Sequence, residues 1–193
     1  VDYPNTPISI PEYQVDYIVK IDRLGDPNKI GSGSTRITKN PVDHIIAENA
    51  AKLVFHSGYF GNGMSFQTGA GGASLATAKY LADIMEEKKV VGSFAIGGIS
   101  SYIINLYERG LFKKMFDVQS FDKGVIPSLL NNDDHIEMSA DHYANPFNAG
   151  AIINNLDVVV LAAYEIDTDF NVNVLVDSHG YAQGASGGHS DTA

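Results

Sequence analysis

The sequence contains no cysteine and no tryptophan, and it has few cations, with 13 Lys and Arg against 23 Asp and Glu. Without cysteine the protein can form no disulfide bond, no cysteine nucleophile and no thiolate zinc site. The formal net charge of −10 would repel phosphate backbones, so nucleic acids and anionic membranes are not expected partners. The longest apolar run, residues 158–164, is far shorter than the roughly 20 residues that span a bilayer, and no leader pattern opens the chain. We therefore expect a cytoplasmic protein.

What the sequence does contain is the composition and periodicity of an α/β fold. Its 193 residues, of which 44% are hydrophobic and 19% charged, suffice for one domain with a sizeable core. Short apolar runs alternate with longer segments of helical periodicity, as in strands joined by helices. We predict a single domain over residues 1–193, built as an open, mainly parallel sheet with helices on both faces. The expected helices cover residues 41–56, 73–87 and 99–109, and the expected strands cover 64–68, 90–96, 116–119, 136–139 and 158–163.

Two further patterns predict where strands lie in the sheet. Val15, Tyr17, Val19 and Ile21 alternate with polar residues, which is typical of a half-exposed strand, so we expect an edge strand here. The run 158–164 is apolar throughout, which predicts a strand in the middle of a parallel sheet with both faces covered.

The sharpest local feature is the loop Thr68-Gly69-Ala70-Gly71-Gly72-Ala73-Ser74, between an expected strand and an expected helix. Glycines let backbone N–H groups point at a ligand, and the start of a helix adds about half a positive charge. Such a turn suits a phosphate or an oxyanion, and close packing without any ligand is an equally good interpretation. No Lys-Ser/Thr pair follows, so this is not a Walker loop, and Ser74 replaces the last glycine of a dinucleotide fingerprint.

Acidic and histidine side chains form weaker candidate sites. Glu165, Asp167 and Asp169 would share one face of a continued strand and could hold a cation or supply a base. Solvated acids at the end of a strand are the more common interpretation. His135 and His142 match no known zinc-ligand spacing, so we expect no metal site.

The tail, residues 170–188, is expected to form a hairpin that closes on a glycine-rich turn. His189, Ser190 and Asp191 are immediate neighbours at the end of that turn and cannot hydrogen-bond in triad order, because adjacent strand side chains face opposite ways. A serine hydrolase is therefore not expected, and His189 is left as a candidate anion donor or substrate contact.

Taken together, four stretches resemble the α subunit of citrate lyase. They occur in one order over most of the chain, so they are more specific than any single glycine loop. The stretches are Gln67–Ala76, Ser93–Gly98, Glu165–Val174 and Gly184–Ala193.

The resemblance implies a citrate CoA-transferase, similar in fold to the family I CoA-transferases, and thus a three-layer CoA-transferase-like domain. The chain would form most of the C-terminal half of a longer subunit. In the implied reaction, citrate displaces acetate from the acetyl thioester of an acyl carrier protein. The thioester sits on a CoA-like phosphopantetheine arm of the acyl carrier (gamma) subunit, so no cofactor bound covalently to this chain is expected. A lyase (beta) subunit would then cleave the citryl thioester in the same hetero-oligomeric complex.

The glycine loop fits that chemistry, because acyl exchange passes through oxyanions that backbone amides stabilise. Related transferases carry a nucleophilic glutamate on the strand after the loop's helix, whereas residues 90–97 hold no carboxylate. We therefore expect direct attack by citrate, with Glu165 as the fallback nucleophile and Arg36 or Arg109 as candidate citrate partners. The expected catalytic residues are Gly71, Gly72 and Glu165, and the expected substrate- or thioester-binding residues are Gly69, Ala70, Ala73, Ser74, Gly97, Gly98, Gly187, Gly188 and His189.

Two other functions remain open at this point. The chain could be a non-catalytic assembly half of the same complex, with the chemistry elsewhere in the subunit. From the glycine turns alone, it could be a nucleotide-dependent α/β enzyme, which the missing phosphate-binding lysine and ribose-binding acid disfavour.

Overall fold

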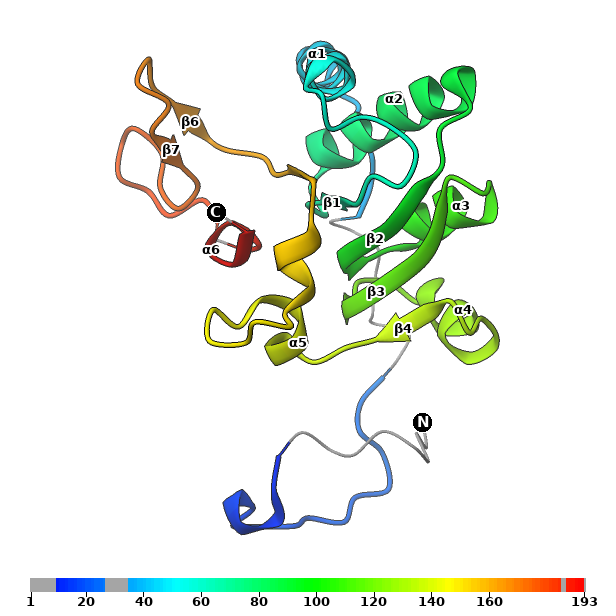
Figure 1. Ribbon diagram of the computed structural model, residues 1–193. Helices are drawn as coiled ribbons and strands as arrows, with labels where there is room; N and C mark the ends of the chain where they lie inside the picture. The colour runs from blue at the N-terminus through cyan, green and yellow to red at the C-terminus, as the bar shows by residue number, and fades with distance from the viewer. Residues whose placement is uncertain (1–9, 27–34, 185–186, 193) are drawn as a thin grey trace. The chain divides into compact units, whose positions relative to one another are not determined.

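The computed structural model describes residues 10–26, 35–184 and 187–192 (Figure 1). Its contacts divide the chain into two units, residues 1–30 and 31–193. In the first unit, the described residues form the 3-10 helix η1 (Glu12–Gln14) and no strand. The predicted edge strand with Val15, Tyr17, Val19 and Ile21 is therefore wrong. Alternation is not sufficient by itself, because a strand also needs a hydrogen-bonded neighbour, and no described strand pairs with this segment.

The second unit contains the sheet and most of the helices (Figure 1). All five strands expected for the sheet are present with shifted ends, as are the three expected helices. Further short helices, which the sequence analysis did not predict, follow β3, β4 and the C-terminal glycines. In chain order the elements are α1 (Pro41–His56), β1 (Phe66–Thr68), α2 (Gly72–Lys88), β2 (Gly92–Ile99), α3 (Ser101–Glu108), β3 (Phe112–Ser120), α4 (Val125–Asn131), β4 (His135–Glu137), α5 (Ala140–Ala144), η3 (Ile152–Asn155), β5 (Val158–Val160), β6 (Glu165–Ile166), β7 (Val172–Asn173) and α6 (His189–Thr192).

The main sheet has the order β4-β3-β2-β1-β5, and every neighbouring pair is parallel. The chain steps outward from β1 to β4 and then returns to the other side of β1 for β5. Right-handed crossovers therefore place α2, α3 and α4 on one face and the α5–η3 connection on the other. The predicted α/β fold with an open, mainly parallel sheet is confirmed.

The position predicted for the apolar run 158–164 is wrong. Only Val158–Val160 joins the sheet, as β5, and it lies at the edge beside β1. Val159 and Val160 are only half-buried. An apolar run shows that a segment avoids water, but the order of strands depends on which connections return to which side of β1.

Local signals in the sequence explain where the first two long helices begin. Asn40 caps α1, because its Oδ1 accepts a hydrogen bond from the Val42 amide at 3.0 Å, and Pro41 occupies the first helical position. α2 begins after Gly71 without any side-chain cap. Its apolar stripe lies against the sheet and is 1% exposed at each of Leu75, Ala78, Leu81 and Met85.

The hairpin predicted for residues 170–188 is reduced to an isolated antiparallel bridge between Val176 and Ala182. β6 and β7 form a separate antiparallel pair of two residues each, which begins at Glu165, before the predicted segment. Residues 187–192 then form a turn and the short helix α6 instead of the end of a hairpin. Residues 185 and 186 of the predicted glycine-rich turn lie outside the described residues.

Candidate active site

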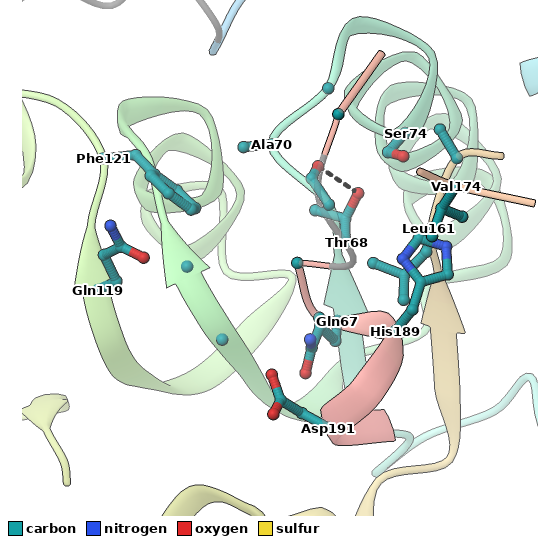
Figure 2. A pocket seen from close by; sticks show the side chains of 18 of the residues that line it. Gln67, Thr68, Ala70, Ser74, Gln119, Phe121, Leu161, Val174, His189 and Asp191 are labelled. Carbon is teal, nitrogen blue, oxygen red and sulfur yellow. Dashed lines mark hydrogen bonds between the residues drawn. The ribbon is translucent and has the colours of Figure 1, made fainter. Parts of the chain in front are cut away.

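A cavity of about 610 Å³ opens beside the glycine loop, at the carboxyl ends of β1, β2 and β5 (Figure 2). Because the chain leaves β1 toward β2 and later returns to β5 on its other side, the cavity lies at the switch point of the sheet. Open parallel sheets bind their ligands at such points. In Figure 2, Phe121 and Gln119 lie on one side, Leu161 and His189 on the other, and Gln67 between them.

Most of the residues proposed from the sequence meet in this cavity, although they come from three separate stretches of the chain. Three do not line it: Gly72 and Ala73 lie at the start of α2, and Glu165 lies on β6. The proposed residues that line it are Gly69, Ala70, Gly71, Ser74, Gly97, Gly98, Gly187, Gly188 and His189.

The loop amides are free to bind a ligand beyond Gly69. The Gly69 N–H is used in the fold, because it donates to the Val160 carbonyl at 2.9 Å. The amides of Ala70, Gly71 and Gly72 donate no hydrogen bond to any described residue. They lie where the backbone donors of a helix start lack internal acceptors, which is an arrangement suited to an anion.

The three glycines of the loop differ in what surrounds them. A Cβ on Gly72 would lie 3.0 Å from the Thr38 amide nitrogen and 3.1 Å from the Arg36 carbonyl, so close packing accounts for this glycine. A Cβ on Gly69 would come within 3.3 Å of Ser74 Oγ. Gly71 is exposed, lines the cavity, and would have nothing within 4 Å of a Cβ. Packing therefore explains Gly72 but leaves Gly71 without a structural reason.

Glu165 is engaged in its own hairpin. Its carboxylate accepts hydrogen bonds from Ser178 Oγ and, at 3.0 Å, from Asn173 Nδ2. These bonds hold the pKa of Glu165 below its ordinary value, and the bond from Ser178 contributes most to this lowering. With both oxygens occupied and its side chain outside the cavity, Glu165 is poorly placed as a nucleophile.

The shared acidic face suggested for Glu165, Asp167 and Asp169 does not form, because β6 already ends at Ile166. The side chain of Asp167 instead closes a turn. Its Oδ1 accepts the amides of Asp169 and Asn171 at 2.8 and 2.9 Å, and Asn171 Nδ2 donates to its Oδ2. The carboxylates thus stabilise local structure.

The histidines at 135 and 142 have separate surroundings. His135 is buried, with Nε2 3.3 Å from Asp117 Oδ2 and Nδ1 2.9 Å from Ser128 Oγ, whereas His142 is exposed on α5. Within residues 10–26, 35–184 and 187–192, no group of three or more His, Asp or Glu side chains could hold a metal ion.

Gln67 and Tyr143 line the cavity and were missed by the sequence analysis. Gln67 Nε2 donates to Tyr143 Oη at 2.7 Å, and this hydroxyl donates back to Gln67 Oε1 at 3.0 Å. A Cβ on Gly97, whose φ is +102°, would lie 3.0 Å from Gln67 Cδ, and one on Gly188 would lie 3.1 Å from Nε2. These two glycines therefore make room for the Gln67 amide. Gln67 does belong to the first resembling stretch, but an amide does not titrate, so a search for acids, bases and nucleophiles passes over it.

The Tyr143 hydroxyl stays protonated at neutral pH. Burial raises its pKa, the negative charge of Asp191 raises it further, and the hydrogen bond with Gln67 lowers it. Tyr143 therefore holds Gln67 as a neutral donor and acceptor.

No lysine or arginine side chain lines the cavity among the residues that the structure describes. Arg109, one candidate citrate partner, pairs instead with Glu86 at 2.8 Å and with Asp83 at 3.9 Å, both on α2. Arg36, the other candidate, is not among the lining residues. The described part of the cavity thus offers amides and hydroxyls to a ligand, with no permanent cation.

The parallel sheet has a cavity at its switch point, and unpaired amides at the start of a helix lie beside that cavity. These features define a ligand-binding α/β protein suited to anionic groups. Comparison with known proteins specifies which one. The chain belongs to the citrate lyase alpha subunit family, because the family model described as "Citrate lyase, alpha subunit (CitF)" matches residues 1–193.

Relatives and a solved structure agree with this assignment. The citrate lyase alpha chain of Escherichia coli is 54% identical over 191 residues, and that of Klebsiella pneumoniae is 52% identical over 193 residues. A crystal structure of the alpha subunit of citrate lyase from Streptococcus mutans, in complex with citrate, is 51% identical with a TM-score of 0.86. These matches cover 99–100% of this chain but only 38% of each relative, so the chain spans well under half the length of the proteins it resembles.

None of the described helices is both long enough and apolar enough to cross a bilayer.

Proposed function

We propose that this chain carries the acyl-exchange site of a citrate lyase alpha subunit, at which citrate replaces acetate on the thioester of an acyl carrier protein. The observation that carries the proposal is the set of unpaired amides at Ala70, Gly71 and Gly72, at and beside the mouth of a cavity. Family membership and the citrate bound to the Streptococcus mutans relative support the choice of substrate.

The proposed reaction consists of two carbonyl substitutions. A citrate carboxylate oxygen attacks the acetyl thioester carbon, and the C–S bond breaks to give an acetyl–citryl anhydride and the carrier thiolate. The thiolate then attacks the citryl carbonyl carbon, and the C–O bond breaks to release acetate and leave the citryl thioester. Each substitution passes through a tetrahedral oxyanion. The amides of Gly71 and its neighbours would stabilise that charge, with each donor contributing about 3–4 kcal/mol.

The proposal includes no covalent glutamyl intermediate. β2, where related transferases carry the nucleophile, contains no carboxylate, and Glu165 is engaged in the hairpin. Asp191 is the one carboxylate among the described lining residues. Citrate therefore acts as the nucleophile, and the protein contributes positioning and oxyanion stabilisation.

The thioester would be supplied by the phosphopantetheine arm of the acyl carrier (gamma) subunit, with no cofactor attached to this chain. Apolar side chains such as Phe121, Leu161 and Val174 give the cavity a surface suited to the aliphatic part of that arm. The beta subunit would consume the citryl thioester. The cations that citrate requires would come from residues other than those described around the cavity, since no described lysine or arginine lines it.

The main test uses a full-length chimera, in which this chain replaces the matched part of the Escherichia coli alpha chain. Acetate release from acetyl carrier protein and citrate is measured for Gly71→Val and, as a control, Gly61→Val. Neither glycine has an atom within 4 Å of a Cβ, so both variants should fold. We expect Gly71→Val alone to lose activity, by about 100-fold, because its side chain would block access to the loop amides. Full turnover by a folded Gly71→Val variant would refute the role of the loop.

Trapping tests the direct attack by citrate. Hydroxylamine or borohydride is added during turnover, and the peptides are then analysed by mass spectrometry. We expect no modified carboxylate in this chain. A modified Glu165 or Asp191 would replace direct attack by a covalent mechanism.

Two alternatives are tested alongside. If this chain is a non-catalytic assembly half, Gly71→Val will leave the activity of the chimera unchanged. If it is a nucleotide-binding enzyme, calorimetry will detect binding of NAD or ATP.

A further inference from the structure

Helix α1 has a large aliphatic surface that no described residue of the second unit covers. Its small residues Ala47 and Ala51 are fully buried, on the side where α1 packs along α2. On the other side, Val42, Ile45, Ile46 and Leu53 are 57–72% exposed. Their spacing of three, four and seven residues places them in one stripe. We call these four residues the α1 aliphatic face.

This arrangement is the reverse of an ordinary surface helix, whose bulky apolar residues face the core and whose polar residues face water. Polar groups near the stripe are satisfied within the helix itself. Asn49 lies in the stripe, but its Nδ2 donates to the Ile45 carbonyl at 3.0 Å. Glu48 and Lys52 lie beside it and pair with each other at 2.7 Å. A contiguous apolar surface without unpaired charge is typical of a permanent protein interface.

We propose that the α1 aliphatic face is the docking surface for the part of the alpha subunit that lies outside these 193 residues. The relatives supply the occupant, because this chain covers 38% of each, so more than half of their polypeptide must pack elsewhere. A segment of the same polypeptide is tethered, and its effective concentration exceeds that of a separate partner. The inference rests on family membership and does not depend on the acyl-exchange mechanism.

The mainly aliphatic character of the face favours a permanent occupant over a partner that binds transiently, and a tethered segment of the same polypeptide meets this requirement. Interfaces that assemble and separate carry more polar and charged groups, whereas interfaces that are never exposed resemble a protein core. Burial of Val42, Ile45, Ile46 and Leu53 would also remove the aggregation liability that such a face presents to water.

Burial of the face is tested first, by cysteine labelling in the full-length chimera. This chain has no cysteine of its own, so Leu53→Cys introduces a single site within it. Glu87→Cys on α2 is the matched control, because the Glu87 side chain is 70% exposed and Leu53 is 72% exposed. Alkylation at each site is followed by peptide mass spectrometry. We expect Leu53→Cys to react at least about tenfold more slowly than Glu87→Cys in the native protein, and equally fast in urea.

Ile46→Cys, two turns earlier on the same face, repeats the measurement in case Leu53→Cys disturbs folding. Native-state reaction of either properly folded variant at the rate of Glu87→Cys would show that the face stays exposed and would overturn the proposal.

The occupant is identified by crosslinking. A benzophenone maleimide is attached to the Leu53→Cys chimera, irradiated in the presence and absence of the beta and gamma subunits, and its adducts are mapped. We expect adducts within the same polypeptide, outside the 193 residues, under both conditions. Adducts to residues 1–30 of this chain, to a second copy, or to the beta or gamma subunit would each assign the face to a different partner and overturn the proposal. Failure of acyl exchange in the same chimera would leave this result unaffected.

Discussion

At the scale of single residues, the glycine loop combines close packing with open backbone amides, which were the two interpretations of its sequence. Gly72 lies too close to Thr38 and Arg36 to accept a side chain, so its identity follows from packing. Gly71 has open space around it and an unpaired amide at the cavity. Two adjacent glycines that are indistinguishable in the sequence therefore have different physical reasons for being glycine, and only their neighbours in space reveal these reasons.

The cavity also depends on a buried pair of neutral side chains. Gln67 is 4% exposed and Tyr143 is 6% exposed, and each makes its hydrogen bonds to the other. A buried amide that loses its partner suffers the full cost of desolvation, whereas an exposed hydroxyl can be replaced at little cost.

We accordingly expect Tyr143→Phe to lower the free energy of unfolding by about 1–3 kcal/mol, because it leaves part of the Gln67 amide unpaired. The matched control is Tyr59→Phe, at a tyrosine that is 63% exposed, and we expect a change of less than about 0.5 kcal/mol. Urea unfolding followed by circular dichroism measures both. Equal stabilities of the two variants would mean that the pair contributes nothing to the fold.

At the scale of elements, the β6–β7 hairpin and the turns beside it depend on carboxylates that accept hydrogen bonds. Hydrogen bonds lower the pKa of three of these carboxyls. The main donor is Ser178 for Glu165, Asn171 for Asp167 and the Tyr181 amide for Asp177. The pKa values of the unfolded chain are 4.5 for Glu and 3.8 for Asp. Because the folded-state pKa values are lower, the ionised carboxylates stabilise the hairpin at a pH above these unfolded values, and this stabilisation is lost as the pH falls below them.

Residues 164–183 should therefore lose protection against amide exchange between pH 5 and pH 3, before the main sheet does. Exchange corrected for intrinsic rates, measured by NMR, provides the test, with α2 as the internal reference. Glu165→Gln should flatten part of this pH dependence. Hairpin protection that follows α2 over the whole range would contradict the expectation.

At the scale of the whole molecule, two features oppose the binding of an anion such as citrate. They are the net charge of −10 and the absence of a described lysine or arginine in the cavity. Citrate carries up to three negative charges, and hydrogen bonds alone do not overcome the repulsion that a strongly acidic protein adds.

We therefore expect no saturable citrate binding by the isolated 193-residue chain in calorimetry, and saturable binding by the full-length chimera. Circular dichroism controls for folding of the isolated chain. Tight binding to the isolated chain would show that these residues hold a complete citrate site.

The sequence by itself determined the type of each long element and the location of the loop. Helical spacing, the Asn40-Pro41 start and the apolar runs are local properties, and they predicted α1, α2, α3 and the five sheet strands. Nine of the proposed site residues do line one cavity, because family-like stretches and the ends of parallel strands converge at the same edge of a sheet.

The tertiary structure decided what depends on distant contacts. It placed β5 at the edge, left Val15–Ile21 without a partner strand among the described residues, and joined Gln67 to Tyr143 across 76 positions. It also turned the small residues of α1 inward and the large ones outward. Periodicity records only that a segment has an apolar side. Which surface covers that side depends on tertiary packing, which periodicity does not record.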